Sequence, residues 1–180
     1  WGYIANNGNL LFGGSIKPGS VYTKFKGTPY WYDSSGTQDT AKVCSDNLFA
    51  IEKQTGRKQW EYRGGKIINT TIVIGSGQVY FVESNSSSLR NEPTSRIDSS
   101  SLWSSLRLVA LNQQTGAKAW SKPITVNKSP YPVVFFLAQA KDRLILSYTT
   151  SRYYVDAFST SNGSKVWSKN HSWNRNHHGG

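Results

Sequence analysis

Residues 48–60 read LFAIEKQTGRKQW, and this stretch decides the fold because it recurs twice in the chain. The copies are LVALNQQTGAKAW at 108–120 and VDAFSTSNGSKVW at 155–167, and all three align without a gap. A recurring unit of this kind has to be recognised first, since it sets the whole architecture. The shared positions are Ala50, Thr55, Gly56 and Trp60, then Ala110, Thr115, Gly116 and Trp120, then Ala157, Asn162, Gly163 and Trp167.

The motif predicts a β-hairpin. An apolar strand enters, a Thr-Gly or Asn-Gly turn reverses the chain, and a second strand ends in Trp. The glycine supplies the positive φ that such turns need. The alanine suits a strand packed closely against a neighbouring sheet. A Trp that recurs in register buries a large area and offers an indole N–H, so we expect it to fasten one repeat to the next.

A second hairpin precedes each motif, at about 2–13, 71–82 and 133–147. Each has two β-branched and aromatic runs separated by a polar turn. One repeat is therefore four antiparallel strands, and repeats of this size are typical of a β-propeller. A sandwich or a barrel would not need the motif in every fourth-strand position. The sequence predicts an all-β propeller fragment: three four-stranded blades at about 1–62, 63–122 and 123–169, then a link at 170–180 that starts a fourth blade.

The pattern Ala-x-Asp-x-x-Thr-Gly-x-x-x-Trp resembles the PQQ-like (pyrroloquinoline quinone-type) β-propeller repeat family. This chain has Glu52, Asn112 and Ser159 where the family often has Asp, and all three can still accept a hydrogen bond. The family includes quinoprotein alcohol dehydrogenases and non-enzymatic propellers such as the outer-membrane assembly lipoprotein. The resemblance implies a ring of seven or eight blades and a periplasmic or otherwise extracytoplasmic bacterial setting. If the dehydrogenase reading holds, it also implies PQQ with calcium.

Three blades do not close such a ring, and the sequence of 180 residues contains no Met. We therefore expect the chain to be part of a longer polypeptide. The remaining blades of the same propeller are then its first expected partners.

Two long connections interrupt the repeats, at about 14–47 and 84–107, whereas the third, near 149–153, is short. All three join the second and third strands of their blades, so they lie on one face together with the links between blades. Expanded loops on one face of a repeat fold usually mark the binding face, and we expect a protein partner or a small ligand there. The 84–107 connection begins with a Ser-rich stretch, which we expect to be mobile and without chemistry.

The first long connection interleaves lysines with aromatic residues. Such a segment can form a pocket for a planar or anionic ligand through stacking and cation–π contact. It can equally serve only to pin a long loop onto the blade. The candidate residues are Lys24, Lys26, Tyr30, Trp31, Tyr32 and Asp33.

All three histidines fall in the last segment, as His171, His177 and His178. Histidine is the commonest metal ligand, a haem ligand and a general base near neutral pH, so a haem- or metal-linked redox role is one reading. The other reading is a polar link between blades. Adjacent His177 and His178 point in different directions and seldom bind one metal together.

Other function classes lack their signatures. Cys44 is the single cysteine, which excludes an internal disulfide framework, a Cys-based zinc site and the vicinal disulfide of quinoprotein dehydrogenases. No P-loop, Gly-x-Ser-x-Gly, His-Glu-x-x-His or EF-hand pattern occurs, and Gly64-Gly65 is a strand-end turn without a phosphate cradle. No apolar run approaches the ~18 residues of a transmembrane helix.

The net charge of +11 is spread along the chain. Residues 1–62 carry seven basic and five acidic side chains, 63–122 seven and three, and 123–180 seven and two. A nucleic-acid groove would concentrate the basic residues, so we expect no nucleic-acid partner. The diffuse charge suits either an acidic partner or a solvated surface.

These observations favour a PQQ-like propeller module that acts as a binding or scaffold domain. The alternative is part of a PQQ-dependent quinoprotein dehydrogenase, whose catalytic residues the sequence does not identify. A weaker alternative is the haem- or metal-linked redox subunit.

Overall fold

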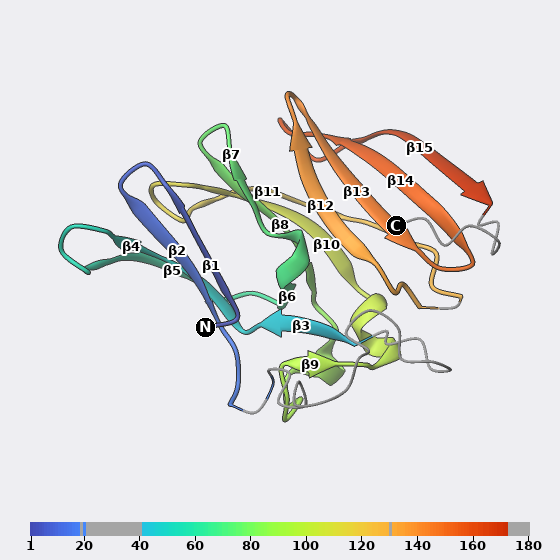
Figure 1. Cartoon of the computed structure of the whole chain (residues 1–180), viewed down its shortest axis with the longest axis horizontal. Helices are drawn as coiled ribbons and strands as arrows, with labels where there is room; N and C mark the ends of the chain where they lie inside the picture. Colours follow the sequence, from blue (N-terminus) through green and yellow to red (C-terminus); the bar gives the residue numbers. More distant parts are fainter. Residues whose placement is uncertain (19, 21–40, 130, 173–180) are drawn as a thin grey trace, which may run out of the picture.

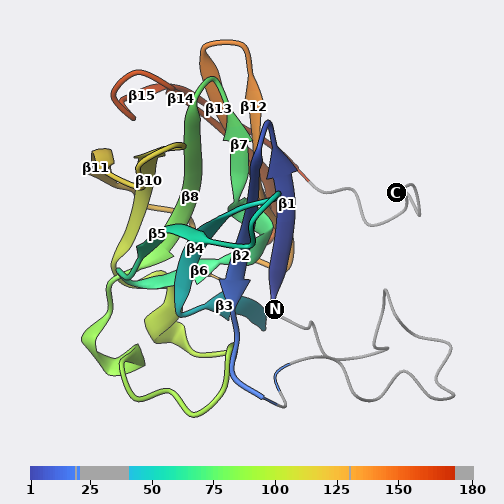
Figure 2. The same cartoon turned by 90° about the vertical axis from the view of Figure 1, so that its left-hand side faces the viewer.

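The computed structural model describes residues 1–18, 20, 41–129 and 131–172, and all its regular secondary structure is β-strand or short 3-10 helix. Three antiparallel sheets lie side by side, one for each repeat (Figures 1 and 2). The prediction of three consecutive propeller blades in an all-β chain is confirmed. The predicted start of a fourth blade falls mainly on 173–180, outside the described residues.

The first blade has the predicted four strands in the order β1-β2-β4-β5. Every neighbouring pair is antiparallel. The strands are β1 (Tyr3–Asn7), β2 (Leu10–Ser15), β4 (Asn47–Glu52) and β5 (Lys58–Tyr62).

The second sheet has seven strands, which corrects the prediction of four. Its motif hairpin and central strand are as expected, but the innermost strand is broken in two by a 3-10 turn at Asn69–Thr71. Two short strands from the long connections extend this sheet further. The strands are β3 (Lys42–Ser45), β6 (Lys66–Ile68), β7 (Val73–Gly75), β8 (Gln78–Ser84), β9 (Arg96–Ile97), β10 (Leu106–Asn112) and β11 (Lys118–Pro123).

The third blade again has four strands, in the order β12-β13-β14-β15. The last strand continues to Ser172, so residues 170–172 belong to the blade and not to the predicted link. The strands are β12 (Phe135–Ala140), β13 (Arg143–Thr149), β14 (Arg152–Ser159) and β15 (Lys165–Ser172).

The three motif turns have the same geometry. Gly56, Gly116 and Gly163 have φ of 71°, 70° and 69°, a region that favours glycine. The N–H of each glycine donates to the carbonyl four residues earlier, at 2.9 Å in every copy. In each hairpin the strand register also shifts just after the motif alanine. One local sequence therefore builds one local structure three times.

The core lies between the sheets, in two layers. One layer joins the first and second blades through side chains such as Phe12, Trp60 and Phe81. The other joins the second and third blades through side chains such as Tyr80, Leu108 and Phe135. Alternate residues of the central strands point into opposite layers because side chains of a strand alternate between its faces. The second blade is therefore apolar on both faces, as a blade between two others must be.

The Ser-rich stretch of the 84–107 connection is packed against the blade through Leu89 and Ile97, which corrects the expectation that it is mobile. The connection forms 3-10 helices at Ser87–Leu89 and Ser100–Trp103. Leu89, Leu102 and Trp103 are 5% exposed or less and belong to the layer between the second and third blades. The serines made this segment look like low-complexity sequence, whereas its few apolar residues anchor it.

Candidate functional site

The predicted ligand-binding residues Lys24, Lys26, Tyr30, Trp31, Tyr32 and Asp33 lie outside the described residues, as do His177 and His178. His171 is described, and it lies on β15 opposite Tyr153 with an exposed side chain. Among the described residues, no three His, Cys, Asp or Glu side chains come together in a group that could hold a metal. The described part of the third blade therefore supplies a single histidine.

The described parts of the long connections and of the links between blades lie on one face, at the lower side of Figure 1, while the hairpin turns lie at the upper side. On this loop-rich face a cavity of about 500 Å³ opens between the first and second blades. Three segments line it: both long connections and the link at 63–66. A site at a junction of repeats, on the face with the expanded loops, is a common position for ligand binding.

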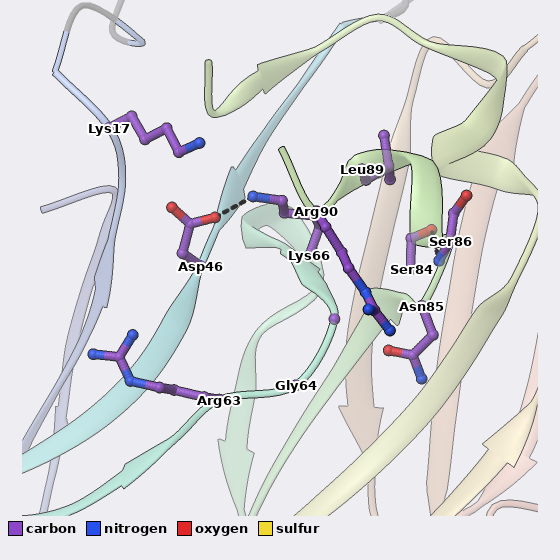
Figure 3. Close-up of a pocket in the computed structure, with 11 residues that line it drawn as sticks. Lys17, Asp46, Arg63, Gly64, Lys66, Ser84, Asn85, Ser86, Leu89 and Arg90 are labelled. Carbon is purple, nitrogen blue, oxygen red and sulfur yellow. Dashed lines mark hydrogen bonds and ion pairs between the residues drawn. The ribbon is translucent and has the colours of Figure 1, made fainter. Parts of the chain in front are cut away.

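Cationic side chains dominate the cavity. Four cations line it, and Asp46 is the only carboxylate among the described lining residues; the cations are Lys17, Arg63, Lys66 and Arg90. Figure 3 shows the Lys66 ammonium directed at the Asp46 carboxylate, with Arg63 and Arg90 on either side. The cavity therefore has an excess of positive charge, and its cationic groups are hydrogen-bond donors only.

Lys66 is the buried cation of the set, with 10% of its side chain exposed. It forms an ion pair and hydrogen bond with Asp46, which is adjacent to β3. An unpaired buried ammonium would be costly, so this pair fixes the floor of the cavity. The other cations also have anchors, since Lys17 donates to the backbone carbonyl of Glu92 and Arg63 pairs with Glu61.

The link between the blades is held tightly beneath the cavity. The N–H of Gly65 donates to Glu83 Oε2 at 2.9 Å, and the hydroxyl of Tyr62 donates to the same oxygen at 3.0 Å. Burial raises the pKa of the Tyr62 hydroxyl, and the charge of Glu83 raises it further. A β-carbon at Gly64 would collide with Tyr62 and Glu83, and one at Gly65 would collide with the Ser84 backbone. Gly65 thus allows close approach of two backbones, and Gly64 leaves room for the Tyr62 and Glu83 side chains.

Cys44 lies close behind the cavity, on β3, and is fully buried with a free thiol. Burial raises the pKa of this thiol to about 12, while the nearby Lys66 and Lys42 lower it by less. The thiolate is the reactive form of cysteine, so Cys44 is held in an unreactive state. It fills space in the core and adds no nucleophile to the cavity.

The arrangement of the described lining residues can bind an anion. Arginine and lysine recognise carboxylate and phosphate oxygens through charge-assisted hydrogen bonds. The described lining holds no histidine, thiol or second carboxylate that could act as a general base. Among the described residues, no helix is long and apolar enough to cross a membrane.

Sequence reasoning missed this site because its cationic residues are far apart in the chain: Lys17, Arg63, Lys66 and Arg90. Each is an isolated basic residue in an evenly basic sequence. The signal that could have found them is topological: two expanded loops and one link, on the same face, in neighbouring blades.

A scan against protein-family models and a search of curated proteins each found no match. A search of solved structures found similar folds at low identity. A europium-containing methanol dehydrogenase is 13% identical, with a TM-score of 0.48 over 73% of this chain and 23% of that one. BamB from Moraxella catarrhalis is 14% identical, with a TM-score of 0.45 over 73% of this chain and 34% of that one. The rhamnogalacturonan lyase YesW is 14% identical, with a TM-score of 0.48 over 79% of this chain and 31% of that one.

The chain thus spans about a quarter to a third of the length of these proteins, which include a dehydrogenase and a lyase. A shared fold does not imply a shared function. In the arrangement of its strands, the chain is similar to parts of BamB and of quinohemoprotein alcohol dehydrogenases.

Proposed function

We propose that this chain is a propeller binding module, in an extracytoplasmic bacterial protein, whose loop-rich face takes a partner through an anionic group. The observation that carries the proposal is the cavity between the first and second blades, lined by four cationic side chains and one carboxylate. The single carboxylate already neutralises Lys66. Arg63 is also paired, with Glu61, but its side chain is exposed, so a bound anion would meet the charge of Lys17 and Arg90 first and could compete with Glu61 for Arg63.

The ion pair and the hydrogen bonds that hold the cavity lining in place suit binding better than catalysis. Lys66 is fixed by Asp46, and the link carrying Arg63 is fixed by the hydrogen bonds to Glu83. A preorganised site binds with a smaller loss of conformational entropy. Arg63 and Arg90 are exposed, and arginine can hold a carboxylate with two parallel hydrogen bonds. We therefore expect carboxylates of an acidic protein segment to bind here.

Titration of the protein with a hexaglutamate peptide at low salt tests the proposal, with binding followed by calorimetry. The double variant R63A/R90A removes two cations from the cavity, and we expect it to weaken binding at least about tenfold. Raising the ionic strength to about 1 M should also weaken binding, because the screening length falls to about 3 Å.

The matched control is K128A/R152A, which removes the same charge from exposed positions of the third repeat, away from the cavity. If the control loses as much affinity as R63A/R90A, the peptide binds the general positive field and the cavity proposal is wrong. No binding by the unmodified protein would also contradict it.

A quinoprotein dehydrogenase is the second candidate, and the same cavity favours it, because PQQ carries carboxylates that cations can hold. Arg63, Arg90 and Lys17 fit such carboxylates. The described lining does not fit calcium, since its only carboxylate is paired with Lys66 and calcium takes six to eight oxygen ligands.

Titration with PQQ, with and without calcium, followed by a dye-linked alcohol assay separates the two candidates. Tight PQQ binding with turnover would replace the binding-module proposal. Binding of the glutamate peptide without PQQ-dependent turnover would support it.

A further inference from the structure

The two long connections are bonded to each other on the loop-rich face, and Ser95 is the centre of this contact. Its hydroxyl, its N–H and its carbonyl all bind residues of the first connection. Ser95 is fully buried, and it is not among the described residues that line the cavity. Because buried polar groups pay a full penalty when they lose their partners, these bonds resist separation of the two connections.

Two of the Ser95 bonds hold one tight turn of the first connection. The N–H of Ser20 donates to the carbonyl of Lys17 at 3.3 Å, and Pro18 stands at the second position, where its fixed φ favours a turn. At one end, the N–H of Lys17 donates to the Ser95 hydroxyl oxygen at 2.9 Å. At the other end, the N–H of Ser95 donates to the Ser20 hydroxyl oxygen at 2.8 Å. Ser95 therefore binds this turn, the Lys17 turn, at both ends.

The third Ser95 bond attaches the same residue to a strand. The N–H of Cys44 on β3 donates to the Ser95 carbonyl at 2.7 Å, beside the pairing of β3 with β9. Ser20 is only 1% exposed, and its hydroxyl oxygen lies 3.3 Å from that of Thr94. The Lys17 turn is thus connected to a β-sheet through buried hydrogen bonds, so it cannot shift without breaking them.

Lys17 is the residue of this turn that reaches the cavity. Its ammonium donates to the backbone carbonyl of Glu92 (Figure 3 shows the side chain). A lysine ammonium has three N–H donors, so donors that Glu92 does not use can meet a bound anion. Arg90 lines the same cavity, and the like charges of Lys17 and Arg90 repel each other. The Ser95 bonds oppose this repulsion because they fix the backbone of Lys17.

We propose that Ser95 is a positioning residue of the anion site: it holds the Lys17 turn in place, and the affinity for an acidic partner depends on it. The inference rests on the proposed function, since it assigns a determinant of the same site. The second connection then contributes to binding twice, through the charge of Arg90 and through the placement of Lys17. A serine suits this position because its short hydroxyl can join two closely packed backbones.

A double-mutant cycle with the hexaglutamate peptide tests whether Ser95 acts through Lys17. Lys17→Met removes the ammonium and keeps the length of the side chain, while Ser95→Ala removes the hydroxyl that holds the turn. We expect each change to weaken binding about fivefold, the usual effect of one lost hydrogen bond. The double variant should bind no more weakly than Lys17→Met alone. Independent effects would multiply to about twenty-fivefold and would overturn the proposal.

Ser104→Ala is the matched control for the loss of a serine hydroxyl. Ser104 belongs to the same connection, and its hydroxyl donates to the carbonyl of Ser101 at 2.9 Å, within that connection. The control should keep the peptide affinity of the unmodified protein, and a loss equal to that of Ser95→Ala would contradict the proposal.

Ser20→Ala is a second test in case Ser95→Ala does not fold, as circular dichroism would show. It removes the acceptor of the Ser95 N–H and leaves Ser95 itself in place. We expect it to weaken peptide binding when Lys17 is present and to have no further effect beside Lys17→Met. An equal loss in both backgrounds would overturn the proposal.

Amide hydrogen exchange of the free protein, followed by NMR, separates this proposal from the proposed function. Exchange of the Lys17 N–H should be at least about tenfold faster in Ser95→Ala and unchanged in Ser104→Ala. Unchanged exchange in Ser95→Ala would overturn the positioning role even where the peptide binds. If exchange becomes faster but the unmodified protein binds no peptide, Ser95 does hold Lys17 and the proposed function is what fails.

Discussion

At the scale of single residues, the three motif glycines share one backbone conformation but differ in what surrounds them. Gly56, Gly116 and Gly163 share the same φ, yet Gly56 faces open space while the other two touch Trp rings. The positive φ alone would cost a side chain about 1–2 kcal/mol at each position. The Trp contact adds a second requirement at Gly116 and Gly163, so these positions are constrained twice.

Gly116→Ala should therefore destabilise the fold more than Gly56→Ala. Strain from the backbone is common to both, and the overlap with Trp60 adds about 1–3 kcal/mol, the usual effect of overpacking. Urea unfolding of the two variants measures the difference. Equal losses would show that Trp60 moves aside without cost.

Trp60→Ala should lower the free energy of unfolding by about 3–5 kcal/mol, as for other large-to-small changes in a core. Trp60 is 8% exposed and has an indole hydrogen bond to the second blade. Trp167→Ala should cost less than about 1 kcal/mol, since the Trp167 side chain is 41% exposed and a surface position loses little. Denaturant unfolding of both variants at low protein concentration compares them, and a similar loss at both would contradict the unequal burial.

At the scale of elements, β3 is the segment that ties two blades together. It belongs to the long connection of the first blade but pairs with β6 and β9 in the second sheet. Asp46, next to it, pairs with Lys66, and the Cys44 side chain enters the core between the second and third blades. The connection therefore acts as a strap, and opening the strap would open the cavity as well.

Cys44 reports on this strap. Because it is fully buried with its thiol pKa raised, a thiol reagent at pH 8 should react with it at least about 100-fold more slowly than with the unfolded chain. Reactivity should return only as β3 opens, at a rate that follows unfolding when urea is added. The time course of colour release with an aromatic disulfide measures it. Rapid reaction of the folded protein would show that β3 detaches on its own.

At the scale of the whole molecule, burial raises the pKa of one cysteine thiol and of several tyrosine hydroxyls. Burial raises the pKa of Cys44 to about 12 and that of Tyr148 to about 12, and it raises the pKa of Tyr62, Tyr80 and Tyr3 as well. Each group keeps its proton in the folded chain above the pH at which the unfolded chain loses it. Proton release on unfolding then favours the unfolded state as the pH rises.

Stability should therefore be insensitive to these groups below about pH 9 and fall between pH 9 and 12. Each buried group contributes a slope of up to about 1.4 kcal/mol per pH unit once its unfolded form is ionised. Urea unfolding at pH 7, 9, 10 and 11 measures the slope, and Cys44→Ala should flatten it between pH 9 and 10. Stability that rises over this range would contradict the direction of the shifts.

The sequence could predict the hairpins because their causes are local. Turn glycines, alternating apolar residues and the Trp of each motif act within about a dozen residues, and each repeat gives an independent copy of the same signal. The same reasoning could not predict β3, since a four-residue strand in a long connection pairs with residues more than twenty positions away. It also took a Ser-rich segment for a mobile loop, although Leu89 and Ile97 anchor that segment in the core.

By itself, therefore, the sequence determined the repeat, the three blades and the residues that join them. Only the tertiary structure decided that Lys17, Arg63, Lys66 and Arg90 line one cavity, and that the Trp60 side chain is buried between two blades with its indole N–H bonded to Gln113. The physical reason is distance along the chain. Strand and turn preferences are set by near neighbours, whereas a charge cluster and a blade face exist only after the sheets have packed.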